Sequence, residues 1–245
     1  MAINYTPIKV LFSIGNINVP SHGFMLAMGF LFFIIGFLFL IKKKRLNFDV
    51  ALAGVLIGII GGIIGARVTY VFYKGNFLDL ASYFTPKLEG TVFYGGFIFS
   101  VILVYLYLRF KKENPLNYFD ALGISIFLLL AIGRIGCFLN WCCYGIQSSL
   151  PWAIKVGTDI ARHPTQIYSS LFNFTAFFAF LKMSKKQRPS GYFFALFLIV
   201  YGIFRFFIEF IRIEPKIIWI FSLSQIVSIF VVSFGILILK RKIRI

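Results

Sequence analysis

The sequence predicts an all-α, polytopic integral membrane protein with seven transmembrane helices, its amino terminus outside and its carboxyl terminus in the cytoplasm. Of its 245 residues, 60% are hydrophobic and the mean hydropathy is +0.89, whereas soluble domains are only about half apolar. Apolar runs of spanning length alternate with shorter polar stretches. Most of the 25 Lys and Arg cluster at alternate ends of these runs, and the positive-inside rule then sets the orientation.

The first part of the chain contains four predicted spans. Residues 1–22, which include Pro7 and Pro20, are expected to be an irregular or interfacial lead-in without firm structure. The first span covers residues 23–41 and stops at the basic cluster Lys42–Arg45. The next three spans cover about residues 50–73, 92–110 and 119–139.

The second part begins with the longest loop, residues 140–165, which we expect on the outer side. Three further spans follow at about residues 166–181, 191–211 and 218–239, and basic residues end the first and last of them. No cleavable secretory signal precedes the first span, so we expect that helix to stay in the protein. Residues 1–245 are therefore predicted to form a single membrane domain.

The net charge of +17 raises the possibility of a nucleic-acid partner. The bases, however, lie in short clusters that flank apolar runs and form no continuous basic face. Membrane topology explains this charge better, and we expect membrane lipids and no nucleic acid among the partners.

Three arginines lie inside predicted spans instead of beside them. Arg67, Arg134 and Arg205 belong to the second, fourth and sixth spans, all of which run outward. At about 1.5 Å per residue, all three fall in the outer half of a hydrocarbon core about 30 Å thick. Each could simply snorkel to the outer head groups. Three at one depth favour a shared anion site, and the phosphate of a phospholipid suits guanidinium donors.

Other polar residues near this depth have both a structural and a functional interpretation. Glu209 lies one turn after Arg205 and is foremost an ion-pair partner. Tyr94 is either an interfacial anchor or part of the site, and Gly95-Gly96 allows close approach of a backbone or lipid. His22 and His163 are the only histidines, and structural hydrogen bonding is the simpler role for both.

The three cysteines, Cys137, Cys142 and Cys143, form no disulfide framework. Free buried thiols are the first expectation, and a disulfide from Cys137 to Cys142 or Cys143 is the alternative. A metal site is not expected, because the cysteines and His163 lack finger-like spacing. We therefore predict no metal and no cofactor.

Several motifs together resemble the prolipoprotein diacylglyceryl transferase family of the bacterial inner membrane. The similarity runs from about residue 20 to the end of the chain. It rests on Gly65-Ala66-Arg67 with Tyr70, Gly95-Gly96, Gly133 to Gly136, Asn140 to Gly145, Arg162 to Gln166 with Tyr168, and Tyr201-Gly202 through Arg205 and Glu209 to Arg212.

The resemblance implies transfer of the diacylglyceryl group of phosphatidylglycerol to the lipobox cysteine thiol of a prolipoprotein, the first step of lipoprotein maturation. It implies that Arg134 and Arg205 hold the phosphoglycerol leaving group. Tyr94 is the third catalytic residue that we expect, as hydrogen-bond partner or proton acceptor for the thiol, with His22 or His163 as the alternative in that role. The implied substrate-binding residues are Arg67, Gly95, Gly96, Asn140, Gly145, His163, Gln166, Tyr201 and Glu209. The implied partners are phosphatidylglycerol and a prolipoprotein signal peptide, at the bacterial cytoplasmic (inner) membrane.

The chain departs from the family pattern at two places. Tyr94 stands where typical members have a histidine before Gly-Gly, and Trp141-Cys142 stands where they have glycine and an acidic residue. Two alternatives therefore stay open. One is a related lipid-modifying transferase with another acceptor, in which Cys142 or Cys143 acts as a nucleophile. The other is a non-enzymatic phospholipid-binding membrane protein.

Overall fold

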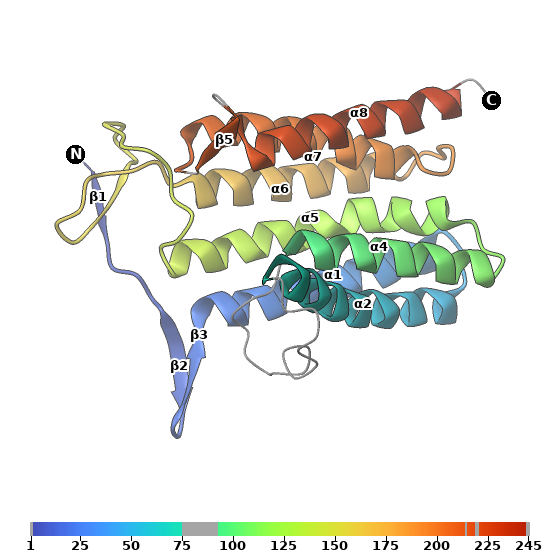
Figure 1. The fold of residues 1–245 in the computed structure, drawn as a ribbon, viewed down its shortest axis with the longest axis horizontal. Coiled ribbons are helices and arrows are strands. Elements are labelled where there is room, and N and C mark those ends of the chain that lie inside the picture. Colours follow the sequence, from blue (N-terminus) through green and yellow to red (C-terminus); the bar gives the residue numbers. More distant parts are fainter. Residues whose placement is uncertain (1, 75–92, 214, 219–220, 244–245) are drawn as a thin grey trace. The chain divides into compact units, whose positions relative to one another are not determined.

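The computed structural model describes residues 2–74, 93–213, 215–218 and 221–243. Within them the chain is mainly helical, and each predicted span lies largely within one helix (Figure 1). The helices are α1 (Ser21–Lys43), α2 (Phe48–Lys74), α4 (Phe93–Phe110), α5 (Pro115–Leu139), α6 (Thr165–Met183), α7 (Tyr192–Ile208) and α8 (Leu223–Ile243), and a short 3-10 turn, η1 (Glu209–Ile211), extends α7.

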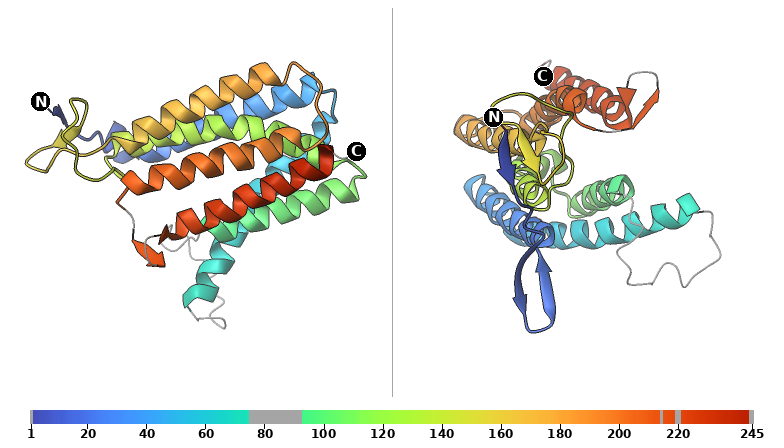
Figure 2. Two further views of the ribbon diagram at one scale, coloured as in Figure 1. Left: turned by 90° about the horizontal axis from the view of Figure 1, so that it is seen from above. Right: turned by 90° about the vertical axis from the view of Figure 1, so that its left-hand side faces the viewer.

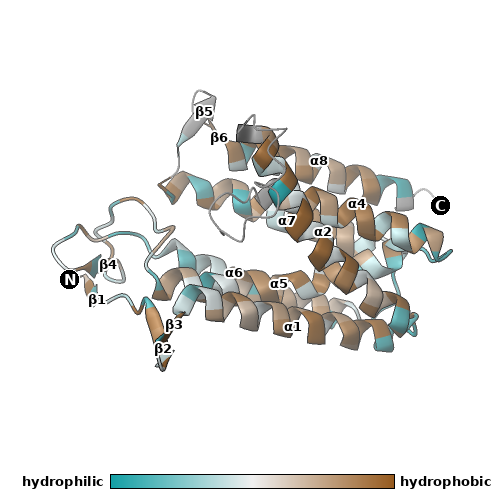
Figure 3. Ribbon diagram, turned by 60° about the horizontal axis from the view of Figure 1, so that its bottom comes forward, coloured by the Kyte–Doolittle hydropathy of each residue, from teal (hydrophilic) through white to brown (hydrophobic). Residues whose placement is uncertain are grey.

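Five of these helices are long and apolar enough to cross a membrane, namely α1, α2, α5, α7 with its extension, and α8. Figure 3 shows hydrophobic residues along these helices and hydrophilic residues at many of their ends. Helix α4 is apolar but shorter. Helix α6 buries a row of polar residues, Thr165, Gln166, Ser169, Ser170 and Asn173. The chain is thus an all-α, multi-pass membrane protein, and the number of seven spans stays a prediction.

The expectation that residues 1–22 lack firm structure is wrong. Strands β2 (Val10–Ile14) and β3 (Ile17–Pro20) form an antiparallel hairpin that precedes α1 (Figures 1 and 2). Its two-residue turn begins at Gly15, whose φ of +57° is the left-handed conformation that such hairpin turns need. β1 (Ile3–Tyr5) pairs in parallel with β4 (Ile154–Val156), and β5 (Lys216–Ile218) pairs with β6 (Phe221–Ser222).

The chain forms two compact units. One comprises the residues up to Phe37 together with Phe119–Ile245, and the other comprises Leu38–Tyr118. In the first unit, α6, α7 and α8 run alongside one another (Figures 1 and 2). Phe127 of α5 joins this group, because its ring meets Phe180 of α6 and Phe197 of α7 edge-on at 5.1 and 5.2 Å. Such edge-to-face contacts are favoured by the quadrupoles of the rings.

Asp120 on α5 caps the start of α7 in this unit. Its two carboxylate oxygens accept hydrogen bonds from the amides of Gly191 and Phe194, each at 2.9 Å. The first amides of a helix have no partner within the helix, and the helix dipole favours a negative charge there. Asp120 therefore joins α5 to the start of α7.

In the second unit, glycines bring α2 and α4 into close contact, as the sequence predicts. A methyl group on Gly96 would lie 2.6 Å from the carbonyl oxygen of Gly62, and one on Gly61 would lie 2.7 Å from the side chain of Leu103. Ser100 of α4 donates a 2.8 Å hydrogen bond to the carbonyl of Gly58. Small residues that allow such backbone approach are typical of helix pairs in membranes.

We predict that Gly96→Ala destabilises the protein by roughly 1–3 kcal/mol, because the added methyl group must force α2 and α4 apart. The matched control is Gly54→Ala on α2, where a new methyl group meets no atom within 4 Å. Thermal unfolding of the purified protein in detergent measures both. Equal melting temperatures for the two variants would contradict the packing role of Gly96.

Candidate functional site

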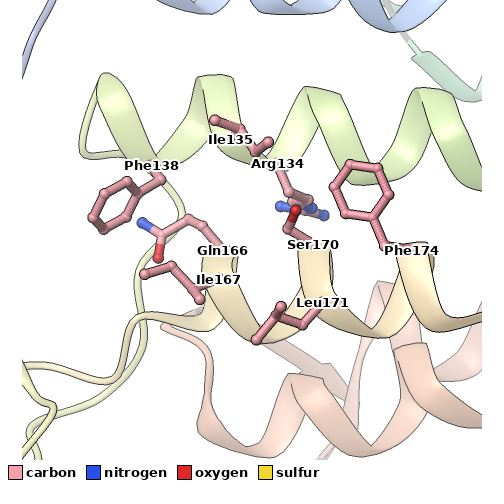
Figure 4. Close-up of a pocket in the computed structure, with 8 residues that line it drawn as sticks. All are labelled: Arg134, Ile135, Phe138, Gln166, Ile167, Ser170, Leu171 and Phe174. Carbon is pink, nitrogen blue, oxygen red and sulfur yellow. The ribbon is translucent and has the colours of Figure 1, made fainter. Parts of the chain in front are cut away.

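Arg134 lies near the end of α5 and borders a cavity between α5 and α6. The cavity has a volume of about 320 Å³, and Figure 4 shows Arg134 of α5 facing Ser170 and Phe174 of α6. The Ser170 hydroxyl donates to the carbonyl of Ala131 at 3.0 Å, which ties the two helices together beside the arginine. The lining residues are Arg134, Ile135, Phe138, Gln166, Ile167, Ser170, Leu171 and Phe174.

The cavity combines one cation with a mostly apolar wall. Five of its lining side chains are hydrocarbon, and among the described residues that line it Arg134 alone is charged. An arginine at membrane depth is costly unless it faces a polar partner or cavity, so such a residue marks a functional site by default. A guanidinium against an apolar wall suits a ligand with an anionic group and a hydrocarbon part.

Arg205 of α7 belongs to a second cluster, centred on the carboxylate of Glu209. The Arg205 guanidinium donates to Glu209 at 2.5 Å and to the Ser224 hydroxyl at 2.9 Å. Ser222 donates a 2.8 Å hydrogen bond to the other oxygen of Glu209. The side chain of Glu209 is only 2% exposed, so the paired-carboxylate role suggested by the sequence fits its geometry.

Arg212 is the cation of this cluster that sequence analysis missed. In the sequence it is only the end of the motif that begins at Tyr201, yet it is buried and its guanidinium lies 3.7 Å from the Glu209 carboxylate. The available signal was the three-residue spacing from Glu209, which places two helical residues on one face. With two arginines around one carboxylate, the cluster keeps a net positive charge.

The charges of the Arg134 site and of the Glu209 cluster interact electrostatically. Arg134 and Arg212 both lie within electrostatic range of Arg205, and Tyr201 of α7 lies within range of both Arg134 and Arg205. The Tyr201 ring is held in place by stacking on Phe197, 5.6 Å away. The fold thus brings Arg134, Arg205 and Tyr201 into one region, and the roles expected for them stay predictions.

The end of α5 is closed by a cap that places the loop beside Arg134. The amide of Trp141 donates to the carbonyl of Phe138 and that of Cys142 to the carbonyl of Cys137, at 2.9 and 3.0 Å. Trp141 has a φ of +51°. These two bonds and the left-handed residue define a Schellman motif, in which glycine is usual at the Trp141 position. Asn140 is the last residue before this turn.

Aromatic packing holds Trp141 in that conformation. Its ring stacks on Tyr144 at 5.4 Å and lies 5.8 Å from Tyr5. Tyr5 in turn stacks on Phe138 at 4.7 Å. Contacts between aromatic rings therefore offset the cost of about 1–2 kcal/mol for a non-glycine residue in left-handed conformation.

The first residues of α6 hold the loop from the other side. Gln166 donates a 2.7 Å hydrogen bond to the carbonyl of Cys142, and Thr165 donates a 2.8 Å bond to the carbonyl of Cys143. Gly145 pairs with the backbone of His163, and a methyl group on it would lie 2.5 Å from the carbonyl of Ile211. Gln166 and Gly145 therefore have structural roles in holding the loop, and these roles explain both residues without a bound substrate.

His163 and its neighbours form a polar surface on this loop. Its Nδ1 lies 3.3 Å from the hydroxyl of Tyr168, which also accepts a 2.8 Å hydrogen bond from Trp152. The guanidinium of Arg162 and the amide of Ile160 hold the pKa of the Asp159 carboxyl below its ordinary value, because both stabilise the carboxylate. The Asp159 side of this ion pair is exposed, whereas Arg162 is half-buried.

The remaining predicted site residues belong to the second unit. Gly95 and Gly96 pack α4 against Thr69 and Gly62 of α2. The guanidinium of Arg67 lies over the ring of Tyr70, 5.9 Å from its centroid. Tyr94 falls in the first turn of α4, and its side chain lies outside the described residues. Roles for Arg67, Gly95, Gly96 and Tyr94 in a substrate site stay predictions.

The fold and this region define a class of protein, namely a multi-pass helical membrane protein with an arginine on the wall of a largely apolar cavity. The chain belongs to the prolipoprotein diacylglyceryl transferase family, whose profile matches residues 9–241. This confirms the resemblance carried by the sequence motifs.

Named relatives cover nearly the whole chain. A phosphatidylglycerol–prolipoprotein diacylglyceryl transferase of Clostridium tetani is 36% identical over 237 residues, which span 94% of this chain and 95% of that protein. Transferase 2 of Clostridium perfringens is 31% identical over 238 residues, with 94% and 93% coverage. The corresponding enzyme of Finegoldia magna is 30% identical over 233 residues and covers 94% of each chain.

We predict that Glu209→Gln destabilises the protein by about 3 kcal/mol, because it leaves two buried guanidiniums without their carboxylate. Asp159→Asn is the matched control, since it removes the exposed acid of an ion pair and should change stability little. Thermal unfolding in detergent measures both variants. A melting temperature of Glu209→Gln equal to that of the control would show that Glu209 does not hold the arginine cluster together.

Proposed function

We propose that this chain transfers the diacylglyceryl group of phosphatidylglycerol to the lipobox cysteine thiol of prolipoproteins in the bacterial cytoplasmic membrane. Family membership supports the reaction, since the relatives are named for phosphatidylglycerol and prolipoprotein. The observation in this chain that carries the proposal is Arg134 on the wall of an apolar cavity between two helices. Such a site can hold a phosphate at the guanidinium and hydrocarbon along the rest of its wall.

The proposed topology has seven spans with the amino terminus outside. The basic cluster Lys42–Arg45 and the basic end of α8 would then face the cytoplasm. Helix α6 would be the seventh span despite its polar face, because Ser169, Ser170 and Asn173 are buried against the protein and not exposed to lipid. The loop 140–165 would lie outside, where a prolipoprotein presents its lipobox.

In the proposed reaction, the substrate thiol attacks the glyceryl carbon that bears the phosphate. A carbon–sulfur bond forms, the carbon–oxygen bond to phosphate breaks, and glycerol phosphate leaves with the electron pair. Arg134 and Arg205 would stabilise the negative charge that develops on this leaving group. Tyr94 is the proposed hydrogen-bond partner or acceptor for the thiol proton, in the place of the usual histidine.

Substrate binding would draw on residues around the two cationic sites. Tyr201 interacts electrostatically with both arginines, which supports the proposal that it orients the phosphoglycerol group. Arg67, Gly95 and Gly96, which belong to the second unit, are likewise proposed to bind substrate. Asn140, Gly145, His163, Gln166 and Glu209 are proposed to shape the substrate site by holding the loop and Arg205 in place.

We predict that Arg134→Ala lowers the rate of transfer from labelled phosphatidylglycerol to a lipobox peptide by about a hundredfold or more, because a preorganised donor to the leaving group is lost. Arg134→Lys should fall between the wild type and Arg134→Ala, since it keeps the charge without the planar pair of donors.

Arg188→Ala is the matched control, because Arg188 is exposed and lies over Tyr192 at the start of α7. It should transfer at the rate of the wild type. Transfer by Arg134→Ala at that same rate would refute the phosphate role, and a wild-type protein that binds phosphatidylglycerol without transfer would refute the enzyme assignment. A mass increase on the protein itself would instead indicate a cysteine nucleophile.

A further inference from the structure

The three cysteines of the chain form one cluster at the end of α5. The sulfurs of Cys137, Cys142 and Cys143 all lie within 4.8 Å of one another, and all three thiols are free. The sequence argued against a metal site because of the spacing of these residues. Their spacing along the chain, however, says little about distances across a helix cap, and the fold places all three thiols together.

The helix cap explains why the thiols meet. In a Schellman motif, the residue that follows the left-handed position is called C″. The side chain of C″ contacts the side chain of the residue five positions before C″. Here these residues are Cys142 and Cys137, joined by the 3.0 Å bond between the amide of the first and the carbonyl of the second. Cys143 also has a left-handed backbone, with φ of +61°, which turns its side chain back toward the pair.

Hydrogen bonds from α6 anchor the backbone of this cluster. Gln166 and Thr165 hold the carbonyls of Cys142 and Cys143, at 2.7 and 2.8 Å. The backbone that carries the sulfurs of Cys142 and Cys143 is therefore held by hydrogen bonds at both residues. Such preorganisation favours a ligand site, because little chain entropy is lost when the ligand binds.

The distances suit a metal ion better than a disulfide. Zinc–sulfur bonds of about 2.3 Å at tetrahedral angles put two sulfurs about 3.8 Å apart, which requires the present cluster to contract by about 1 Å or less. A disulfide requires a sulfur–sulfur distance of about 2.05 Å, and thus a larger movement of two anchored residues. The cluster also has an entry path, since Cys143 is exposed, Cys142 is half-buried and Cys137 is buried.

Two further features fit a thiolate–metal complex. The Nδ1 of His22, at the start of α1, lies 4.0 Å from the sulfur of Cys137, so one imidazole approaches the cluster. Arg134 and Arg212 lie within electrostatic range of Cys143. Three thiols release three protons when they bind Zn²⁺, which leaves one net negative charge on the complex, and neighbouring cations stabilise it.

We propose that Cys137, Cys142 and Cys143, with His22 as fourth ligand, bind a thiophilic d10 metal ion such as Zn²⁺. Three thiolates and one imidazole form a common closed coordination set for structural zinc. The ion would fasten the loop after α5 to the start of α1, one helical turn from Arg134. The inference stands independently of the proposed transfer reaction, because it rests on the thiol cluster and needs no lipid.

The test uses the full-length chain in detergent, reduced and then freed of reductant without oxygen. Elemental analysis after Zn²⁺ loading and desalting should find about one zinc per chain. Because the chain has 3 cysteines in total, alkylation counted by intact mass reports this cluster alone. We expect three alkylations in chelator and at least tenfold slower alkylation with Zn²⁺. Co²⁺ in place of Zn²⁺ should show sulfur-to-cobalt charge-transfer absorption.

Cys143→Ser is the variant of choice, since Cys143 is the exposed member and the fold tolerates a serine there most easily. It should lose stoichiometric zinc and the charge-transfer band while its melting temperature in chelator matches that of the wild type. His22→Ala should keep the band and bind zinc more weakly. Asp159→Asn, which removes an exposed carboxylate of the same loop, should bind zinc as the wild type does.

Three results would overturn the proposal. The first is equal alkylation rates with and without Zn²⁺. The second is zinc binding by Cys143→Ser as tight as that of the wild type. The third is a disulfide in the wild type purified in air and left unreduced, formed with oxygen as the oxidant and leaving one alkylated thiol, because a redox pair would then be the role of the cluster.

Discussion

The arginine region depends on the ion pairs that the Glu209 carboxylate forms with Arg205 and Arg212. This carboxylate accepts hydrogen bonds from Arg205 and from Ser222, and Arg212 lies 3.7 Å away. Charges buried among apolar helices are tolerated only when they are paired and hydrogen-bonded. The Glu209 carboxylate therefore allows α7 to carry the Arg205 guanidinium among apolar helices. Through Ser224, Arg205 also links α7 to the first turn of α8.

The loop that follows α5 depends on that cluster and on the helix cap together. Gly145 forms a backbone bridge with Arg212, so the loop is joined to the segment that carries the second buried cation. The Schellman turn at Trp141 sets where the loop starts, and Gln166 holds it against α6. These backbone hydrogen bonds fix the course of the loop beside the end of α5.

Composition and periodicity predict the helices and the intramembrane arginines of this chain. The apolar runs predicted every described helix, and the three intramembrane arginines directed attention to the region that holds Arg134 and Arg205. Sequence analysis was less successful where side chains form their contacts only in the fold. Arg212 directly follows the 3-10 turn η1, and its burial beside Glu209 comes from the fold of that segment. The amino-terminal hairpin was missed because its Gly15-Asn16 turn was not recognised between the short apolar runs on either side.

The sequence by itself determined that this chain crosses a membrane several times and that it belongs to its transferase family. Both follow from local properties, namely the cost of polar groups in hydrocarbon and the presence of contiguous motifs. Only the tertiary structure decided which polar groups meet. Glu209 sits between two arginines, and Asp120 binds the start of α7. The three cysteines gather within 4.8 Å because a left-handed turn folds the chain back on the end of α5, and such a turn is a property of backbone geometry that residue spacing does not encode.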